Sequence, residues 1–177
     1  IDGDEIRVNS ADKLFEFLKA DFIETLEFNE GSVLERYFKG TTSQVLDSQG
    51  VVSVNMEITM SFDMAPTSVM VSYFSFDKAT GNILKITDVI DSSKNAEFLK
   101  ISEKHFNETT KKYEYTMSPF YEGKFFNAPA FLIGNDGLYF CFNSFEVLDE
   151  RKFEYKIPFA DLKGLVKKGS VLERFVK

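Results

Sequence analysis

The chain is poor in the residues that most often carry cross-links, metal sites and acid–base chemistry. Its 177 residues include one cysteine, one histidine and no tryptophan. Cys141 cannot form an internal disulfide, and together with His105 it falls short of the several Cys and His ligands of a typical zinc site. A Ser-His-Asp triad would have to use His105. We therefore expect no metal and no cofactor, and interpret Cys141 as a small residue in or near the core.

Long apolar runs and clusters of basic residues are also missing. No stretch approaches the ~20 apolar residues that a membrane-spanning helix needs. Basic residues number 21 against 28 acidic ones, a net charge of −7, which argues against nucleic acid and anionic lipid as partners. The chain begins at Ile1 rather than Met, so we interpret its start as processed or truncated. Membrane attachment is expected only through a removed N-terminal anchor.

Phenylalanine is abundant, with 20 residues, and hydrophobic residues make up 44% of the chain. These values are typical of a globular protein with a core of packed aromatic rings. A length of 177 residues suits one compact domain or two small, closely packed ones.

The first part of the chain predicts a helix followed by long strands. Ser10 suits a helix N-cap, and Gly31 lies where that helix is expected to end. The apolar face of this helix carries, at helical spacing, Leu14, Phe15, Leu18, Phe22 and Leu26. Val51 to Phe62 alternates apolar and polar residues, which predicts a half-solvated strand with Ser68 to Asp77 as its antiparallel partner.

A second helix is predicted from a cap at Ser92 or Ser93, with Phe98, Ile101 and His105 on one stripe. The segment before it, from Tyr73 to Ile90, predicts a strand, a glycine turn and a short strand.

A hairpin is predicted from residues 125–133 and 138–147. Its turn is Asn135-Asp136-Gly137, three residue types that tolerate positive φ. A last strand covers Phe153 to Ile157, and Pro158 opens a short helix that carries Leu162 and Leu165. The order of elements predicts an α+β fold with a largely antiparallel sheet and two main helices, in two closely packed subdomains, residues 1–70 and 71–177.

Two groups of residues offer acid–base chemistry. Glu108, three residues after His105 on the predicted helix, could orient it as a general base, whereas its apolar neighbours favour a structural histidine. Glu146, Asp149 and Glu150 lie near a strand end and could form a glycosidase-like pair, although Asp149 to Lys152 also has the composition of a charged turn.

Aromatic residues crowd an irregular segment that follows the second predicted helix. They are Tyr113, Tyr115, Phe120, Tyr121, Phe125 and Phe126. Core packing explains them most simply, but exposed rings here could form a surface that binds carbohydrate or protein.

The second half of the chain resembles an extracytoplasmic family of unknown function. This family forms the C-terminal part of RsiV-like anti-sigma factors, which are lysozyme receptors, and occurs beside peptidoglycan deacetylase domains and in bacterial lipoproteins. The resemblance covers roughly residues 70 to 166, and residues 6 to 70 look like its companion N-terminal module. It is carried, in order, by Phe76-Asp77, Thr80-Gly81, Leu84, Thr87-Asp88-Val89-Ile90, Phe131-Leu-Ile133, Asp136-Gly-Leu-Tyr-Phe140, Phe145-Glu146-Val147 and Ile157-Pro158-Phe159.

Two loops depart from the family's pattern. Asp63 to Ser68 stands where the family carries a Gly-Ala-His-Gly-like loop, and Leu148 to Phe153 stands where it carries Ala-Pro-Tyr-Ala-Ala-Gly. The resemblance implies that any ligand contacts come from these loops and from the aromatic segment. The candidate ligand-binding residues are Asp63, Met64, Tyr121, Asp149, Glu150 and Arg151.

The resemblance implies a non-enzymatic, extracytoplasmic binding or sensing module of a bacterial envelope protein. Its partner would be a cationic protein such as lysozyme, which an acidic chain attracts, or peptidoglycan. Two alternatives stay open: a carbohydrate-active hydrolase that uses paired carboxylates, and a structural spacer without a ligand.

Overall fold

A computed structural model describes the chain in several segments. They are residues 37–61, 68–111, 124–128, 130–143 and 152–176, together with Ala20, Phe120 and Glu146. The helix predicted after Ser10 lies outside these residues, apart from Ala20. The subdomain boundary near residue 70 falls inside a strand of the structure and stays a prediction.

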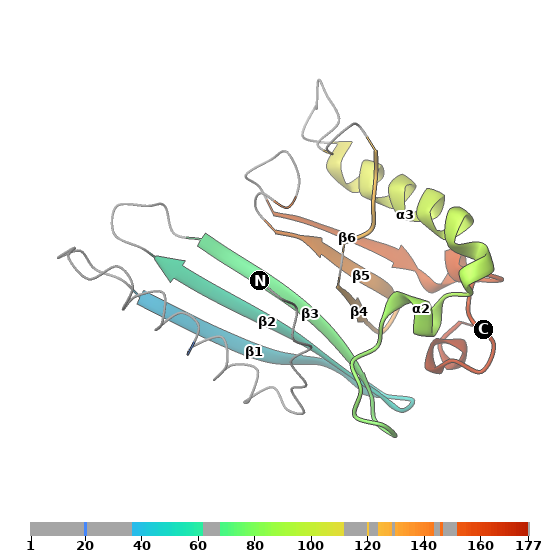
Figure 1. The fold of residues 1–177 in the computed structure, drawn as a ribbon, viewed down its shortest axis with the longest axis horizontal. Helices are drawn as coiled ribbons and strands as arrows, with labels where there is room; N and C mark the ends of the chain where they lie inside the picture. The colour runs from blue at the N-terminus through green and yellow to red at the C-terminus, as the bar shows by residue number, and fades with distance from the viewer. Residues whose placement is uncertain are drawn as a thin grey trace.

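Sheet 1 is an antiparallel meander of three long strands: β1 (Tyr37–Ser48), β2 (Val51–Ser61) and β3 (Ser68–Asp77) (Figure 1). The predicted strands over β2 and β3, and their antiparallel pairing, are confirmed. Sequence reasoning did not locate β1, because its central residues Thr41 to Gln44 are all polar and all exposed. Without an apolar face, this strand has no period-two signal.

The two faces of β2 differ as its alternation predicts from Met56 onward. At the start of the strand, Val52 and Val54 are half-buried, whereas Val51 and Ser53 on the other face are completely buried. Met56 and Ile58 are 2% and 1% exposed on the apolar face, and Glu57 is exposed on the other. Ser53 lies on the polar face but is completely buried, because the first strand of the second sheet lies over it. Its hydroxyl is 3.0 Å from that of Ser75 on β3, and Ser75 Oγ accepts a 2.8 Å hydrogen bond from the backbone N–H of Ile133.

Sheet 2 consists of β4 (Phe131–Ile133), β5 (Gly137–Phe142) and β6 (Phe153–Pro158), again antiparallel and in sequence order. The predicted hairpin is confirmed, with shorter strands. The expected reason for its glycine was wrong, because neither Gly137 nor the two residues before it has a positive φ. Gly137 is required because a Cβ there would overlap the carbonyl oxygen of Ile157 on β6.

The second predicted helix is α3 (Asn95–Thr110), which follows a 3-10 turn, η1 (Ser92–Lys94). The predicted caps at Ser92 or Ser93 were wrong. Asp91 is the N-cap of η1, and its carboxylate accepts a 2.9 Å hydrogen bond from the backbone N–H of Ser93.

The apolar stripe of α3 is centred differently from the prediction. Phe98, Ser102 and Phe106 are buried, whereas Ile101 and His105 are half-buried at its edge. Ser102 belongs to the stripe because its hydroxyl lies 2.9 Å from that of Tyr155 on β6, which satisfies both buried groups.

The short strand predicted before Ile90 was wrong. Only isolated bridges form here, from Ile83 to Phe76 and from Ile90 to Val166, and between them the chain makes the one-turn helix α2 (Ile86–Val89). The glycine turn before it is confirmed, because Gly81 has a φ of +72° and donates its N–H to the Asp77 carbonyl at 2.7 Å.

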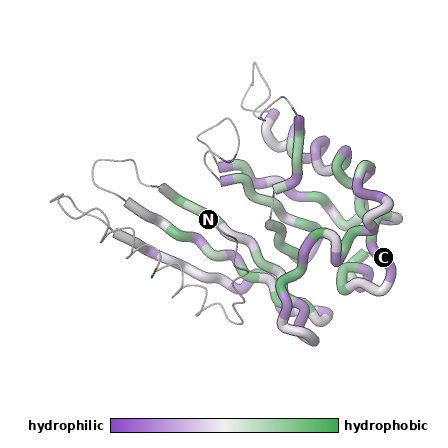
Figure 2. Tube along the Cα trace, viewed as in Figure 1, coloured by the Kyte–Doolittle hydropathy of each residue, from purple (hydrophilic) through white to green (hydrophobic). Residues whose placement is uncertain are grey.

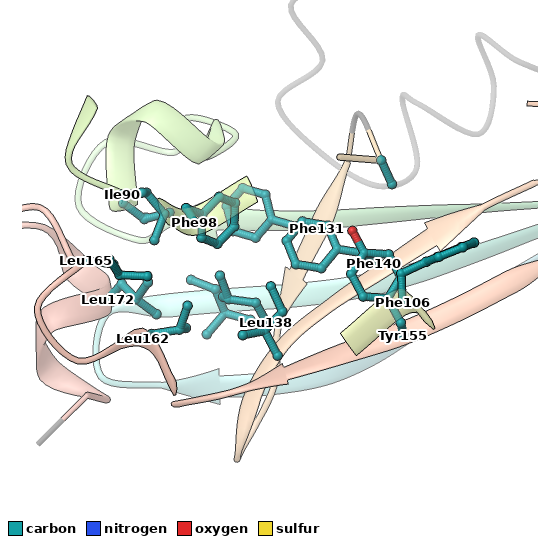
Figure 3. Packing of buried hydrophobic residues seen from close by; sticks show 14 of the residues in the cluster. Ile90, Phe98, Phe106, Phe131, Leu138, Phe140, Tyr155, Leu162, Leu165 and Leu172 are labelled. Carbon is teal, nitrogen blue, oxygen red and sulfur yellow. The ribbon is translucent and has the colours of Figure 1, made fainter. Parts of the chain in front are cut away.

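The main core lies between α3 and one face of sheet 2 (Figure 3). Figure 2 shows hydrophobic residues along both α3 and the strands of this sheet. Phe106 is at its centre, with ring centroids 4.9–5.8 Å from those of Phe120, Phe125, Phe142, Phe153 and Tyr155. A short helix follows Pro158 as predicted, the 3-10 turn η4 (Phe159–Leu162), but it ends before Leu165. Leu162 of η4 and Leu172 of the turn η5 (Val171–Arg174) close the core. The protein therefore has a phenylalanine core, with sheet 1 on the opposite side of sheet 2.

Candidate functional site

The six candidate residues from the sequence cannot be placed in the structure. The described segments leave out all of them, namely Asp63, Met64, Tyr121, Asp149, Glu150 and Arg151. Their ligand-binding role therefore stays a prediction. Glu146, one of the carboxylates considered for a catalytic pair, is described and exposed.

The second face of sheet 2 packs against sheet 1. We call this contact the seam; it contains Val71 and Tyr73 from β3, Leu132 from β4 and Cys141 from β5. All four are buried. The side chains reach the seam because residues alternate between the two faces of each strand, so Leu132 and Cys141 point away from the phenylalanine core.

A pocket of about 120 Å³ lies along the seam. We call it the seam pocket. Its lining residues are Met70, Val71, Ser72, Tyr73, Ala130, Cys141, Asn143 and Glu146. Most of these side chains are apolar or weakly polar, and the exposed Glu146 carboxylate adds negative charge. The pocket can thus enclose an apolar group whose polar end lies near this carboxylate.

Asn143 holds the two sheets together beside this pocket. Its side-chain Oδ1 accepts a 2.6 Å hydrogen bond from the Val71 backbone N–H, and its Nδ2 donates a 3.0 Å bond to the Val71 carbonyl. The amide thus pairs with β3 as a neighbouring strand would. The backbone N–H of Asn143 donates to Glu146 Oε2 at 2.6 Å, which fixes this carboxylate at the pocket.

Tyr73 makes a further polar link across the seam. Its hydroxyl donates a 2.7 Å hydrogen bond to Glu154 Oε1 on β6, and Lys152 Nζ lies 3.4 Å from the same oxygen. Burial, and then the bond and charge of Glu154, raise the pKa of Tyr73 well above its usual range. The phenol therefore stays protonated and keeps its hydrogen bond at neutral pH.

Cys141 lies on the pocket wall as a neutral thiol. Burial first, and then the charges of Glu154 and Glu146, raise its pKa to about 12, against the opposing effect of Lys152. Its 6% exposure confirms the interpretation of a small residue in or near the core. A thiol with a raised pKa has little of the thiolate that a nucleophile requires.

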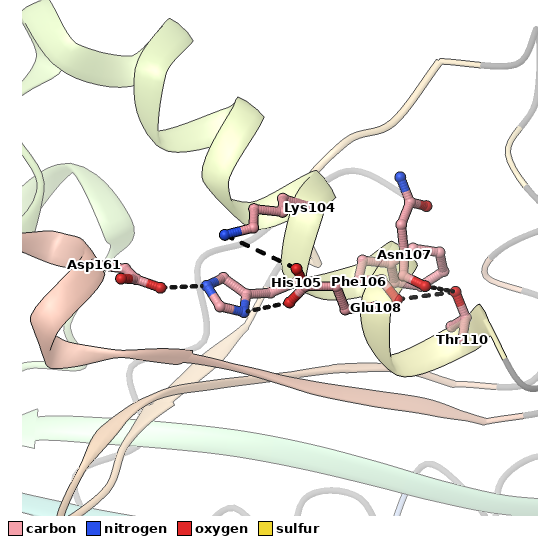
Figure 4. Close-up of polar contacts among 7 residues, drawn as sticks. All are labelled: Lys104, His105, Phe106, Asn107, Glu108, Thr110 and Asp161. Atoms are coloured by element: carbon pink, nitrogen blue, oxygen red, sulfur yellow. Dashed lines mark hydrogen bonds and ion pairs between the residues drawn. The ribbon is translucent and has the colours of Figure 1, made fainter.

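His105 forms a separate polar cluster on the helix side of the molecule (Figure 4). Its Nε2 lies 2.7 Å from Asp161 Oδ2 in η4, and its Nδ1 lies 3.6 Å from Glu108 Oε2. The expected proximity of Glu108 is confirmed, and Lys104 lies 3.9 Å from the same glutamate. The imidazole thereby connects α3 to the C-terminal segment. We therefore interpret His105 as a structural residue.

The aromatic segment is only partly described. Phe120 and Phe125 are 4% and 9% exposed and pack on Phe106, as the core interpretation predicts. Phe126 is 41% exposed, although its ring lies 5.3 Å from that of Phe142. Among the described rings of this segment, Phe126 could therefore contact a partner.

Two classes of feature are absent from the described residues. In those segments, no group of three or more His, Cys, Asp or Glu side chains is placed to hold a metal ion. No described helix is long and apolar enough to cross a membrane.

Several residues of this site were missed by sequence reasoning. Asn143 and Ser75 reach partners 72 and 58 positions away in the chain, and Tyr73 reaches Glu154 over 81 positions. A polar residue within an apolar strand, such as Asn143 after Phe142, was the one available signal. Local patterns could not identify its partner.

Comparison with known proteins finds likeness at the level of structure. No family model and no curated protein sequence matches the chain. A crystal structure of a DUF3298 family member from Bacteroides fragilis superposes with a TM-score of 0.70 at 13% identity, over 90% of this chain and 66% of that one. A DUF3298 family protein from Pseudomonas aeruginosa gives a TM-score of 0.65 at 14% identity, over 86% of this chain and 70% of that one.

At these identities the likeness shows the fold, an α+β fold shared with two bacterial proteins of a family of unknown function. The chain spans about two thirds of the length of those proteins, which contain further residues that this chain does not match.

Proposed function

We propose that the chain is a non-enzymatic binding or sensing module that acts outside the cytoplasm, in the manner of RsiV-like receptors. Its ligand is a basic protein, such as a lysozyme-like enzyme, or a cell-wall glycan. The observation that carries the proposal is the seam pocket, where the Glu146 carboxylate is fixed beside apolar walls in a chain of net charge −7. The shared fold of the DUF3298 family proteins supports it.

The charge balance favours the protein ligand over the glycan. Complementary charge accelerates association and contributes to specificity, and lysozyme is strongly basic. The described polar groups of the seam are held by one another: Tyr73 by Glu154, and Asn143 by Val71. Such a preorganised surface binds with little ordering cost.

The test is equilibrium binding of the purified chain to egg-white lysozyme and, in parallel, to purified peptidoglycan. Both are measured at low salt and at 150 mM salt, because screening weakens non-specific attraction. We expect saturable lysozyme binding that persists at 150 mM salt. Horse cytochrome c, a basic protein of another fold, serves as the charge control.

Binding to neither ligand at 150 mM salt, or equal binding of cytochrome c, would contradict the proposal. The hydrolase alternative makes a separate prediction, which is release of soluble fragments from peptidoglycan by the purified chain. Turnover of that kind would replace the binding proposal.

A further inference from the structure

We propose that the seam pocket binds one lysine or arginine side chain of a basic partner, with the aliphatic stem against its walls and the cationic end beside Glu146. The inference rests on the proposed function, because it assigns to this pocket the contact with the basic ligand.

The size of the pocket sets the first constraint on its occupant. Its volume of about 120 Å³ is similar to that of cavities of about 150 Å³ that hold one benzene molecule, which has six non-hydrogen atoms. A butylammonium group, the end of a lysine side chain, has five non-hydrogen atoms and is of this size. A disaccharide is several times larger, so a glycan chain would have to bind elsewhere.

The walls of the pocket suit a methylene stem. Val71 and Cys141 are buried, and Ala130 is half-buried. Long cationic side chains commonly place their methylene groups along apolar surface and keep the charge at a polar edge. The pocket has both parts of that environment.

The charge around the pocket selects a cation over an anion. Glu146 and Glu154 contribute two negative charges, and Lys152, 3.4 Å from Glu154, offsets one of them. The hydrogen bond from the Asn143 N–H occupies one acceptor position of Glu146, and a carboxylate offers about four. The remaining positions can accept hydrogen bonds from an ammonium or guanidinium group.

The raised pKa values of Tyr73 and Cys141 agree with this assignment. After burial, Glu154 raises the pKa in both cases, and Glu146 adds to the effect at Cys141, where Lys152 opposes both glutamates; negative charge thus contributes to the potential inside the seam. The same potential would repel an anionic ligand and attract a cationic one.

Cys141 provides a direct test, because it is the single thiol of the chain and lies on the pocket wall. Its modification rate is measured with two methanethiosulfonates of similar size, the cationic 2-aminoethyl and the anionic 2-sulfonatoethyl reagents. Each rate is divided by that of the same reagent with N-acetylcysteine. The ratio of the two normalised rates cancels the ionisation of the thiol and reports the local potential.

We expect the cationic reagent to react about tenfold faster than the anionic one, because one net negative charge beside the thiol attracts the first reagent and repels the second. Glu146→Gln, which keeps an oxygen for the Asn143 N–H, should lower this ratio several-fold. Glu103→Gln removes an exposed charge on α3, across the phenylalanine core, and should leave it unchanged. A ratio near one, or equal effects of the two variants, would overturn the inference.

Occupancy is tested with small analogues of the two charge types. n-Butylammonium at high millimolar concentration should slow the reaction of Cys141 with neutral methyl methanethiosulfonate at least twofold, whereas butyrate should not. Equal effects of the two ions would overturn the inference.

The two proposals can fail separately. Cation-selective reaction at Cys141 without binding of lysozyme or peptidoglycan would leave the pocket assignment standing and remove the proposed function. Lysozyme binding at 150 mM salt that is unchanged by Glu146→Gln would leave the proposed function standing and overturn the pocket assignment.

Discussion

The two faces of sheet 2 are packed in different ways. One face meets α3 through a continuous set of phenylalanine rings, in which Phe106 alone contacts five other aromatic residues. The other face meets sheet 1 through the four residues of the seam and a few long-range hydrogen bonds, including those of Asn143. Burial of apolar surface dominates the first contact, and hydrogen bonds to particular polar groups position the second.

This difference suggests how stability and binding are divided. A densely packed face tolerates little change of shape, whereas a contact made by few side chains can leave space for a ligand. The seam pocket lies on this second face. The following predictions test the division, beginning with the largest expected effect.

Phe106→Ala should lower the free energy of unfolding by about 3–5 kcal/mol, because it removes a fully buried ring and leaves a cavity. Chemical denaturation monitored by circular dichroism measures the change. Phe126→Ala, at a ring that is 41% exposed, is the matched control and should cost about 1 kcal/mol. If the two substitutions cost the same, the core is not centred on Phe106.

Gly137→Ala should cost about 2 kcal/mol, because the added Cβ would overlap the Ile157 carbonyl oxygen within sheet 2. Gly81→Ala is the control: its added Cβ meets open space, and only the positive φ of Gly81 disfavours alanine, by about 1 kcal/mol. Thermal unfolding of both variants compares the two causes. A smaller loss at Gly137 than at Gly81 would show that β5 and β6 are less closely packed than the structure indicates.

Asn143→Ala should cost about 1–2 kcal/mol and act locally, because it leaves the Val71 N–H and carbonyl without their side-chain partner. Hydrogen exchange should become faster at the Val71 amide while amides of α3 change little. Asn107→Ala, an exposed asparagine on α3, is the control. Uniformly faster exchange across both regions would mean that the seam and the core open together.

Tyr73→Phe should alter the alkaline stability of the chain. Because the folded state raises the pKa of Tyr73 above its ordinary value of 10.0, this group's contribution is complete below about pH 10 and is lost as pH rises beyond it. The variant lacks this group, so its free energy of unfolding should fall less steeply above pH 10, by up to about 1.4 kcal/mol per pH unit.

The control for this pH effect is Tyr139→Phe. Tyr139 is half-buried and its pKa is raised chiefly by a hydrogen bond to Asp136, so its removal should flatten the slope less. Urea denaturation at several pH values from 9 to 11.5 gives the slopes. A slope for Tyr73→Phe as steep as that of the unmodified chain would contradict the link between Tyr73 and Glu154.

The parts of the fold that local patterns encode could be predicted from the sequence. The alternation over Val51 to Ser61 located β2, and the strand Phe153 to Ile157 was found because its odd-numbered residues are apolar. β1 could not be found, since Thr41 to Gln44 are exposed on both faces and carry no periodic signal. Alternation of apolar and polar residues reflects the burial of one face of a strand, and few of the described side chains of β1 are buried.

Less of the candidate site than of the fold could be predicted from the sequence. Its contacts join residues far apart in the chain, such as Tyr73 with Glu154, and the complete burial of Ser53 depends on β4, which contacts β2 and β3. The hairpin turn shows the same limit: the glycine at 137 was recognised, but its cause is the neighbouring strand rather than its own φ. Only the tertiary arrangement reveals these constraints.

The most direct test of the division between the two faces is hydrogen exchange of the chain, free and saturated with egg-white lysozyme at 150 mM salt. The account predicts slower exchange at Met70 to Tyr73 and at Cys141 to Asn143, with the amides of α3 unchanged. Protection confined to α3, or no change along β3 and β5, would contradict it.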